Sequence, residues 1–256
     1  NVAATPPANP AQVISKGDVY IVEIKDLKIS TEDGEIKSFN LPFSGTGFMC
    51  NDGKFVTARH VIQPWRYRSI ILQDESNTLA AINDFENKGG QLDITYTARS
   101  SSKTPVQFTY KQFIFNADKD VEREYEGYDL KVANDSKTDW AYVNINTQSE
   151  IDYDPVLARK LKAGEKVYTY GYTGGLNLVS KKKLAPLFSE ATIAQDGVTN
   201  GMINVSDKSF GSGHSGGPVF VFRDGRPIAI GIVSAVAGSD IGLIVPIPNF
   251  NTAVDD

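Results

Sequence analysis

Short runs rich in valine, isoleucine, phenylalanine and tyrosine recur along almost the whole chain, each separated from the next by a cluster of turn residues. Runs of this length and composition are typical of β-strands. They occupy residues 19–24, 47–50, 70–73, 91–98, 106–115, 141–145, 166–172, 189–193, 202–205, 218–222, 228–236 and 241–247. The pattern predicts an all-β fold, and the spacing suits two six-stranded antiparallel barrels packed face to face.

The length of the chain fits two such units. With 256 residues, of which 41% are hydrophobic, it can bury one large core or two modest ones. Residues 1–16 begin with a stretch rich in proline and alanine and are expected to form a flexible tether. We expect the first barrel in residues 17–116, a polar connector in residues 117–137 and the second barrel in residues 138–256.

The connector is rich in acidic residues, which raises the question of a metal site. Their spacing does not match the ligand pattern of a known calcium loop, so a solvated connector is the favoured interpretation and no metal is predicted. The acids in question are Asp118, Asp120, Glu122, Glu124 and Glu126.

The segment Gly213-His214-Ser215-Gly216-Gly217-Pro218 lies between a turn and an apolar run. Glycines on both sides can hold Ser215 on a tight turn, with its hydroxyl exposed and nearby N–H groups directed into a cleft. A hydroxyl needs a base to act as a nucleophile, and the chain has two histidines, His60 and His214. Adjacent residues on a tight turn point apart, so His214 is interpreted as structural or pocket-lining, and His60 as the base.

An acid should orient the imidazole of His60 and stabilise its protonated form. Asp139 stands directly before an alternating apolar run and would be partly buried there. Asp129 and Asp135 precede it in a polar loop and remain alternatives. Asp139 is favoured because only it adjoins a clean strand pattern.

These segments, in this order, resemble the chymotrypsin-like serine peptidases, including their bacterial trypsin-like and HtrA-type branches. The matching pieces are GTGFMCNDGKFVTARHVI, TDWAYVNI, and GSGHSGGPVF followed by GIVSAV. The resemblance implies a chymotrypsin-like double barrel with the active site between the barrels. It also implies a serine endopeptidase in which His60 is the base, Asp139 the acid and Ser215 the nucleophile. The N–H groups of Gly213 and Ser215 would form the oxyanion hole, and no cofactor is implied.

The resemblance also assigns substrate-binding positions. Ser209 would lie at the base of the primary pocket, while Ser234, Ala235 and Val236 match the segment that binds substrate backbone and forms a pocket wall. Ser234 would in addition donate a hydrogen bond to the catalytic acid, and Gly242 would leave the opposite wall open. Because Ser209 is not an acid, we expect cleavage after a small or medium uncharged residue rather than after lysine or arginine.

Two positions depart from the animal members of this family. The animal enzymes carry an aspartate directly before the nucleophile, and this aspartate pairs with a newly cut N-terminus. Here the residue at that position is His214, so activation by N-terminal cleavage is not expected. The only cysteine, Cys50, lies in an apolar strand, where it is interpreted as a buried small hydrophobe rather than a nucleophile. No intrachain disulfide can form, which favours a bacterial or viral source.

The net charge of −5 argues against a nucleic-acid or anionic-membrane partner, and no apolar run is long enough for a membrane helix. The expected partner is a protein or peptide substrate, and the sequence does not indicate an oligomeric state. We expect a secreted or periplasmic location, with a cytoplasmic or viral polyprotein setting as the alternative. Two other functions stay open: a binding or scaffold protein with latent catalysis on the same fold, and a peptidase that processes only itself.

Overall fold

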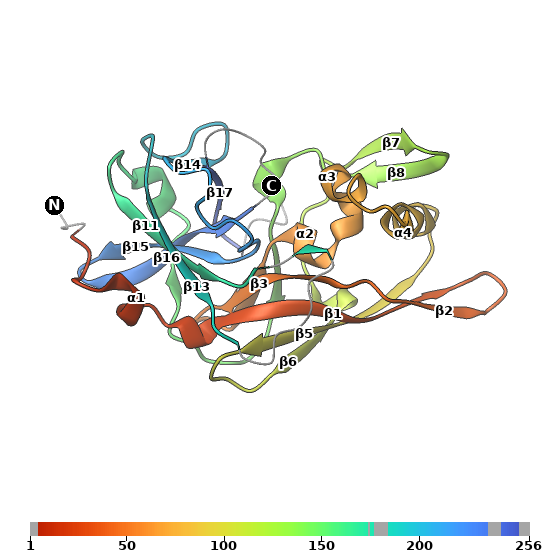
Figure 1. Ribbon diagram of the computed structural model, residues 1–256, viewed down its shortest axis with the longest axis horizontal. Helices are drawn as coiled ribbons and strands as arrows, with labels where there is room; N and C mark the ends of the chain where they lie inside the picture. Colours follow the sequence, from red (N-terminus) through yellow and green to blue (C-terminus); the bar gives the residue numbers. More distant parts are fainter. Residues whose placement is uncertain (1–4, 174, 177–183, 235–241, 251–256) are drawn as a thin grey trace.

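Strands dominate the structure and form two large, mainly antiparallel sheets, each curled into a half-barrel (Figure 1), together with a separate two-stranded sheet. The computed structural model describes residues 5–173, 175–176, 184–234 and 242–250. Each sheet follows a main path of six strands, with one or two short strands paired beside it. The predicted all-β, chymotrypsin-like double barrel is therefore confirmed.

The first sheet runs in the order β6-β5-β1-β3-β4-β9. Its strands are β1 (Val19–Ser30), β3 (Phe43–Met49), β4 (Lys54–Thr57), β5 (Leu92–Ser100), β6 (Val106–Thr109) and β9 (Ala141–Asn144). The short strands β2 (Ile36–Phe39) and β12 (Gly175–Leu176) pair with β1 and β3. Strand β3 is buried along its whole length, consistent with its place between β1 and β4.

The second sheet runs in the order β13-β11-β15-β16-β17-β14. Its strands are β11 (Lys166–Gly171), β13 (Leu187–Thr192), β14 (Ile203–Val205), β15 (Pro218–Arg223), β16 (Arg226–Val233) and β17 (Gly242–Pro246), and β10 (Asp152–Tyr153) pairs in parallel with β16. The hairpin from β15 to β16 turns at Asp224 and Gly225, whose φ angles of 52° and 73° are typical of a two-residue hairpin turn.

Strand β9 belongs to the first sheet, where it pairs with β4. Ala141 lies opposite Thr57, and Asn144 lies opposite Lys54. We expected this segment to begin the second barrel, and that expectation is wrong. The reason is tertiary: β4 offers an edge that β9 can pair with, although the chain between them is long. The pairing brings the start of β9 close to the end of β4. The other domain boundaries stay predictions.

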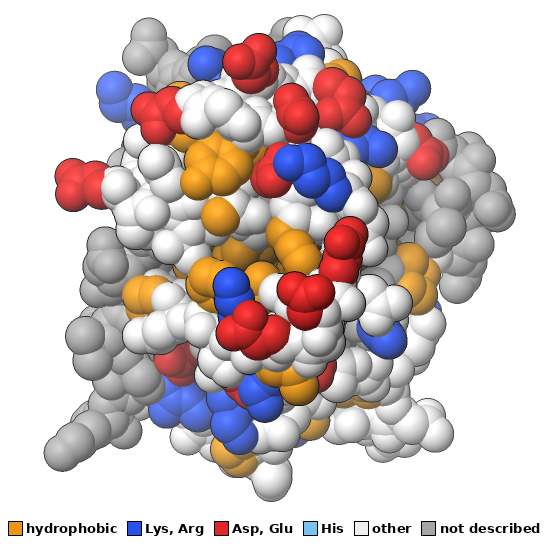
Figure 2. All heavy atoms as spheres, turned by 90° about the vertical axis from the view of Figure 1, so that its right-hand side faces the viewer, with side chains coloured by type: hydrophobic (Ala, Val, Ile, Leu, Met, Phe, Trp, Pro, Cys, Tyr) orange, Lys and Arg blue, Asp and Glu red, His pale blue; other side chains and the backbone are white. Residues whose placement is uncertain are grey.

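Helices and a hairpin were missed by the strand pattern. The helices are α2 (Arg59–Ile62), α3 (Arg68–Ile71) and α4 (Thr78–Asn87). Residues 70–73 therefore do not form the expected strand. Within the connector, β7 (Val121–Tyr125) and β8 (Tyr128–Val132) form a hairpin, and β8 contacts α4. Both lie at one end of the molecule (Figure 1), and Figure 2 shows that end, with acidic and basic side chains around a smaller number of apolar ones.

The segment before β1 is docked rather than free in the described residues. Helix α1 (Pro10–Val13) is followed by Ile14, which is buried in the core. Tyr170 Oη donates a 2.6 Å hydrogen bond to the carbonyl of Ala11. Residues 10–14 thus contact the second barrel, which corrects the expectation of a flexible tether for this part of residues 1–16.

Candidate active site

His60 lies in the first turn of α2, directly after β4. Ala58 is still extended (φ −78°, ψ 144°), and the chain turns into the helix at Arg59. The side chain of His60 is 3% exposed, and its ring packs edge-on against Tyr67 with the centroids 5.7 Å apart. The imidazole is therefore held at the end of a strand, as the sequence predicted.

Asp139 follows the 3₁₀ turn η4 (Ser136–Thr138) and is completely buried. Its Oδ1 accepts a 2.9 Å bond from the backbone N–H of His60, and its Oδ2 lies 2.7 Å from His60 Nδ1, which donates because an ionised carboxylate only accepts. Ser234 Oγ donates a 2.5 Å bond to the same Oδ2, as expected from the sequence. These contacts fix the ring and leave Nε2 as the acceptor.

The electrostatics of this cluster favour an ionised carboxylate. Burial alone would raise the pKa of Asp139, but the charge of His60 and the bonds donated by His60 and Ser234 outweigh it. The pKa of Asp139 therefore lies below its usual range. A buried carboxylate that stays charged can stabilise an imidazolium beside it.

The alternative acids do not contact His60. Asp135 caps η4 by accepting from the backbone N–H of Lys137, and its carboxylate lies 3.6 Å from the Lys137 ammonium. Asp129 is an exposed residue of β8, and its backbone N–H donates to Asp84. Of the three candidate acids, Asp139 is the one that the fold brings to His60.

Ser215 lies on a tight turn between Gly213 (φ 77°) and Gly216 (φ 89°), and it is half-buried. A Cβ atom on Gly216 would overlap the carbonyl oxygen of Thr46 and lie 2.9 Å from the backbone nitrogen of Ala58. The missing side chain lets the turn pack directly on β3 and on the end of β4. Thr46 N–H donates a 2.8 Å bond to the carbonyl of Ser215. The serine turn is thereby brought to the region of His60.

The same turn is bonded to the second sheet. Gly216 N–H donates a 2.8 Å hydrogen bond to the carbonyl of Val233, and Val233 N–H donates a 2.9 Å hydrogen bond to the carbonyl of Gly217. Val233 ends β16 and precedes Ser234. The turn that carries Ser215 and the serine that bonds Asp139 are therefore fixed by one strand.

The oxyanion-hole candidates are open to an incoming group. Among the described residues, the N–H groups of Gly213 and Ser215 donate to no protein acceptor. In the same part of the chain, no hydrogen bond joins Ser215 Oγ to the ring of His60. Such bonds are often long without substrate and shorten only in the complex.

His214 is buried, and it directly precedes Ser215. Its ring packs on Gly171, where a Cβ atom would lie 2.5 Å from the His214 Cβ, so a larger residue there would displace the ring. Its Nδ1 is buried and has no hydrogen-bond partner. Burial lowers the pKa of His214, which favours the neutral form. These contacts support the structural interpretation made from the sequence.

The predicted substrate-binding residues are only partly described. Ser209 is exposed on a turn, where its Oγ and N–H bond Asp207 Oδ1 at 2.7 and 2.8 Å. The sequence reasoning did not single out Asp207, although an aspartate two residues before a serine is a common turn pattern. Gly242 pairs with Val205 at the start of β17. Ala235 and Val236 lie outside the described residues.

Neither a metal site nor a thiol nucleophile emerges from the described residues. No group of three or more metal-ligating side chains gathers within them. Cys50 is fully buried, and that burial raises the pKa of its thiol well above the usual value. Within the same part of the chain, no helix is long and apolar enough to cross a membrane.

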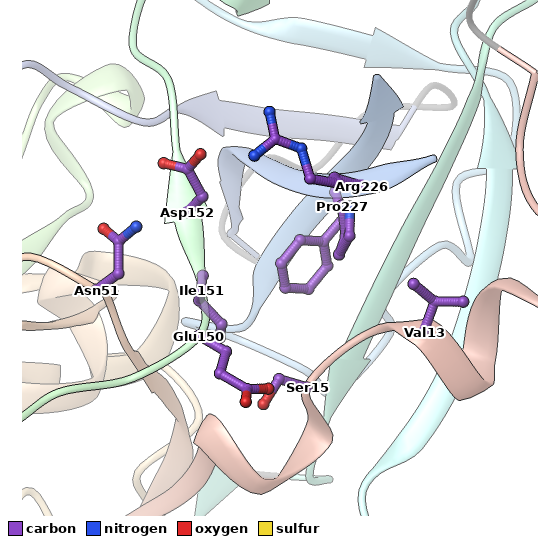
Figure 3. A pocket seen from close by; sticks show the side chains of 9 residues that line it. Val13, Ser15, Asn51, Glu150, Ile151, Asp152, Arg226 and Pro227 are labelled. Atoms are coloured by element: carbon purple, nitrogen blue, oxygen red, sulfur yellow. The ribbon is translucent and has the colours of Figure 1, made fainter. Parts of the chain in front are cut away.

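A separate cavity of about 310 Å³ lies where residues 13–15 meet the turn at Asn51 and the second sheet (Figure 3). Glu150, Asp152 and Arg226 line it, together with apolar side chains that include Pro227. It shares no residue with the cluster of His60, Asp139 and Ser215. The cavity is therefore not part of the candidate active site.

Two solved structures resemble the chain at 14% sequence identity. Deg5 has a TM-score of 0.45, with 92% of this chain and 85% of that chain covered. Neuropsin, a serine protease expressed in the limbic system of mouse brain, has a TM-score of 0.46, with 93% and 92% covered. No curated protein matches the sequence at a significant level.

The family comparison covers the segments that carry all three candidate residues. The sequence model of the trypsin-like peptidase domain matches residues 45–230, which include His60, Asp139 and Ser215. This match spans well over half of the chain. The protein therefore belongs to the trypsin-like peptidase family.

Proposed function

We propose that the protein is a serine endopeptidase that hydrolyses peptide bonds through an acyl-enzyme. The observation that carries the proposal is the buried pair of His60 and Asp139, bonded through both carboxylate oxygens, beside a serine on a glycine-flanked turn. Family membership supports the reaction class, and this pair supports the choice of His60 and Asp139 as catalytic residues.

In the proposed reaction, Ser215 Oγ attacks the substrate carbonyl carbon while His60 Nε2 takes the hydroxyl proton. Asp139 keeps the proton of the imidazole on Nδ1 and stabilises the imidazolium that forms. The N–H groups of Gly213 and Ser215 donate to the oxyanion of the tetrahedral intermediate. His60 then gives its proton to the leaving amine. A water molecule, activated by His60, hydrolyses the acyl-enzyme and restores Ser215.

The proposed substrate is a protein or peptide with a small or medium uncharged residue before the cleaved bond. Ser209 offers no charge for a lysine or arginine side chain. We further propose a secreted or periplasmic location.

One observation favours a second candidate, a latent binding protein on the same fold. Ser215 Oγ is not bonded to His60 among the described residues; in an active peptidase this bond would form when substrate binds, whereas in a latent protein it would stay absent. A self-processing peptidase is the other alternative, and it would keep the same residues but show no turnover of added substrate.

A fluorophosphonate probe separates both peptidase functions from the latent binding protein, because it reacts only with an activated serine. We expect rapid labelling of the wild-type protein and none of Ser215→Ala. The matched control is Ser212→Ala, which changes an exposed serine of the same turn and should label normally. A peptide library read by mass spectrometry then tests turnover and specificity. Labelling that persists in Ser215→Ala, or its absence in the wild type, would exclude the proposed reaction.

A further inference from the structure

A buried ion pair lies directly beside the candidate base. Arg59 immediately precedes His60 on α2, and its side chain is 1% exposed. Its Nη1 and Nη2 donate to Oδ1 and Oδ2 of Asp120 at 2.7 and 2.6 Å, and the side chain of Asp120 is 4% exposed. This is a bidentate pair of two planar groups, which fixes orientation as well as distance.

The remaining contacts of the guanidinium join two separate segments. Nε donates a 2.7 Å bond to Oε1 of Gln63, the residue that directly follows α2. Nη1 also donates a 3.3 Å hydrogen bond to the carbonyl of Asn116. The guanidinium carbon lies 5.1 Å from the ring centre of Phe115. Arg59 therefore ties α2 to residues 115–120.

The helix that carries His60 has little to hold it by itself. It is four residues long, and Ala58 at its N-terminus makes no side-chain capping bond. A single turn of helix is unstable without tertiary contacts. Fixing a catalytic side chain to within a fraction of an ångström requires a rigid support. Arg59, the first residue of α2, and Gln63, directly after its last residue, supply this support.

The support continues toward α4. Gln63 Nε2 donates to Tyr110 Oη, and Tyr110 Oη donates a 2.8 Å bond to Glu86 Oε2 in α4. Glu86 also pairs with Arg66. The polar contacts of α2 thus run from Asp120 on one side to α4 on the other.

Stability alone is a weak reason for such a pair. Removing two charges from water costs several kcal/mol, and apolar replacements of buried ion pairs are often neutral or stabilising. A requirement for exact placement of the helix explains the ion pair more directly. The bidentate geometry is directional, and Asp120 lies 61 residues from Arg59 in the sequence.

We propose that Arg59 and Asp120 are positioning residues for the reaction. Their bidentate pair fixes α2, and through it the imidazole of His60, relative to Asp139 and Ser215. The inference deepens the proposed peptidase function and rests on it for its kinetic effect. Neither residue touches the reacting atoms.

Positioning makes a different prediction from simple electrostatics. If only charge matters, removing Arg59 leaves a negative Asp120 and moves the pH midpoint of acylation upward. Removing the charge of Asp120 leaves a positive Arg59 and moves the midpoint downward. If placement matters, both changes lower the plateau rate of acylation. Because the residues act as one unit, the double variant should be no worse than the worse single variant.

The test compares Arg59→Met, Asp120→Asn, their combination and Arg59→Lys with wild type. The matched control is Arg223→Met, which breaks the 2.7 Å pair of Arg223 and Glu165, with side chains 17% and 14% exposed, in the second barrel. Thermal unfolding by circular dichroism reports the fold. Acylation kinetics across pH report kcat and KM. Nitrogen-15 histidine NMR reports the Nδ1–H of His60 without requiring activity, and the chain has only two histidines to assign.

We expect each single variant to lower kcat by about 10-fold or more with KM little changed, since misplaced groups lose transition-state stabilisation. The His60 Nδ1–H signal should weaken through faster exchange, and Arg59→Lys should recover part of both losses. Arg223→Met should lower the unfolding temperature alone.

Unchanged plateau rates and an unchanged His60 signal in folded variants would overturn the proposal, and so would opposite pH shifts without loss of rate. If Arg59→Met does not fold, Arg59→Lys and Asp120→Asn decide the matter by the same measurements. Failure of the wild type to react with a fluorophosphonate would instead remove the proposed peptidase function. The NMR signal would then still show whether Arg59 positions His60.

Discussion

Ser234 Oγ and His60 Nδ1 donate to the same carboxylate oxygen of Asp139, at 2.5 and 2.7 Å, although they come from different sheets. His60 follows β4 in the first sheet, whereas Ser234 follows β16 in the second. The carboxylate therefore joins the two half-barrels at the point where the candidate triad is assembled. The relative position of the two half-barrels and the orientation of the His60 ring are therefore linked through Oδ2 of Asp139.

Ser234→Ala tests this link. This substitution removes one hydrogen-bond donor to the buried carboxylate of Asp139. A hydrogen bond to a charged group contributes about 1.5–3 kcal/mol to stability. We expect kcat to fall by about 10- to 100-fold while the protein stays folded. The pKa of Asp139 should rise toward its usual value, because one of the bonds that lower it is lost. An unchanged kcat would show that Ser234 is dispensable for holding the acid.

Asp139→Asn should have a larger effect. The amide would favour the wrong imidazole tautomer, and the same change in a triad of this kind costs about 10⁴ in kcat. Asp135→Asn and Asp129→Asn are the matched controls, and both should retain near wild-type turnover, since neither acid reaches His60. Steady-state kinetics on one peptide substrate compares all three. If a control variant is inactive and Asp139→Asn is active, the acid is assigned wrongly.

Residues next to short, strong patterns could be predicted from the sequence. His60, Asp139 and Ser215 each stand beside a strand or turn pattern that places them at its end. Ser234 could be placed through the family resemblance, and its bond to Asp139 is present. In these cases the local pattern and the final contact involve the same few residues.

Features that depend on distant partners could not be predicted. Asp120 looks solvated within an acidic stretch, and only the fold shows that Arg59 covers it. Strand β9 has the same pattern whichever sheet it joins, so its pairing with β4 is decided by tertiary geometry. Helix α4 begins at Thr78, after Asn77, whose side chain makes no capping bond; the N–H of Leu79 is instead bonded by Asp74, five residues earlier, a pairing that no local capping pattern marks.

Gly216→Ala should disrupt the nucleophile turn. The φ of 89° disfavours any side chain, and the new Cβ would overlap Thr46 and lie 2.6 Å from Thr57 Oγ1. We expect a loss of several kcal/mol in unfolding free energy or, where the protein folds, a loss of fluorophosphonate labelling. Gly225→Ala is the matched control, because its φ is 73° but no atom lies within 4 Å of the added Cβ. It should cost only about 1 kcal/mol. Equal effects of the two changes in urea unfolding would mean that crowding at Gly216 is unimportant.

The last prediction concerns the two histidines. His60→Ala should abolish acylation, because no base then remains within reach of Ser215. His214→Asn should retain a large fraction of it, since His214 is turned toward Gly171 and its Nδ1 bonds nothing. A variant His214→Asn that is folded but as inactive as His60→Ala would contradict the structural role of His214.

Wild type and His214→Asn should also differ in how the free energy of unfolding depends on pH. Burial lowers the pKa of His214 below 6.5 in the folded state, so the unfolded chain binds the proton more readily. The resulting stabilisation is fully present above about pH 6.5 and is lost as the pH falls toward the folded pKa. Urea unfolding of wild type and His214→Asn at pH 7.5 and 5.5 measures this, because other titrating groups cancel in the difference. We expect wild type to lose more stability than His214→Asn between these pH values. An equal loss would show that His214 is not held neutral by the fold.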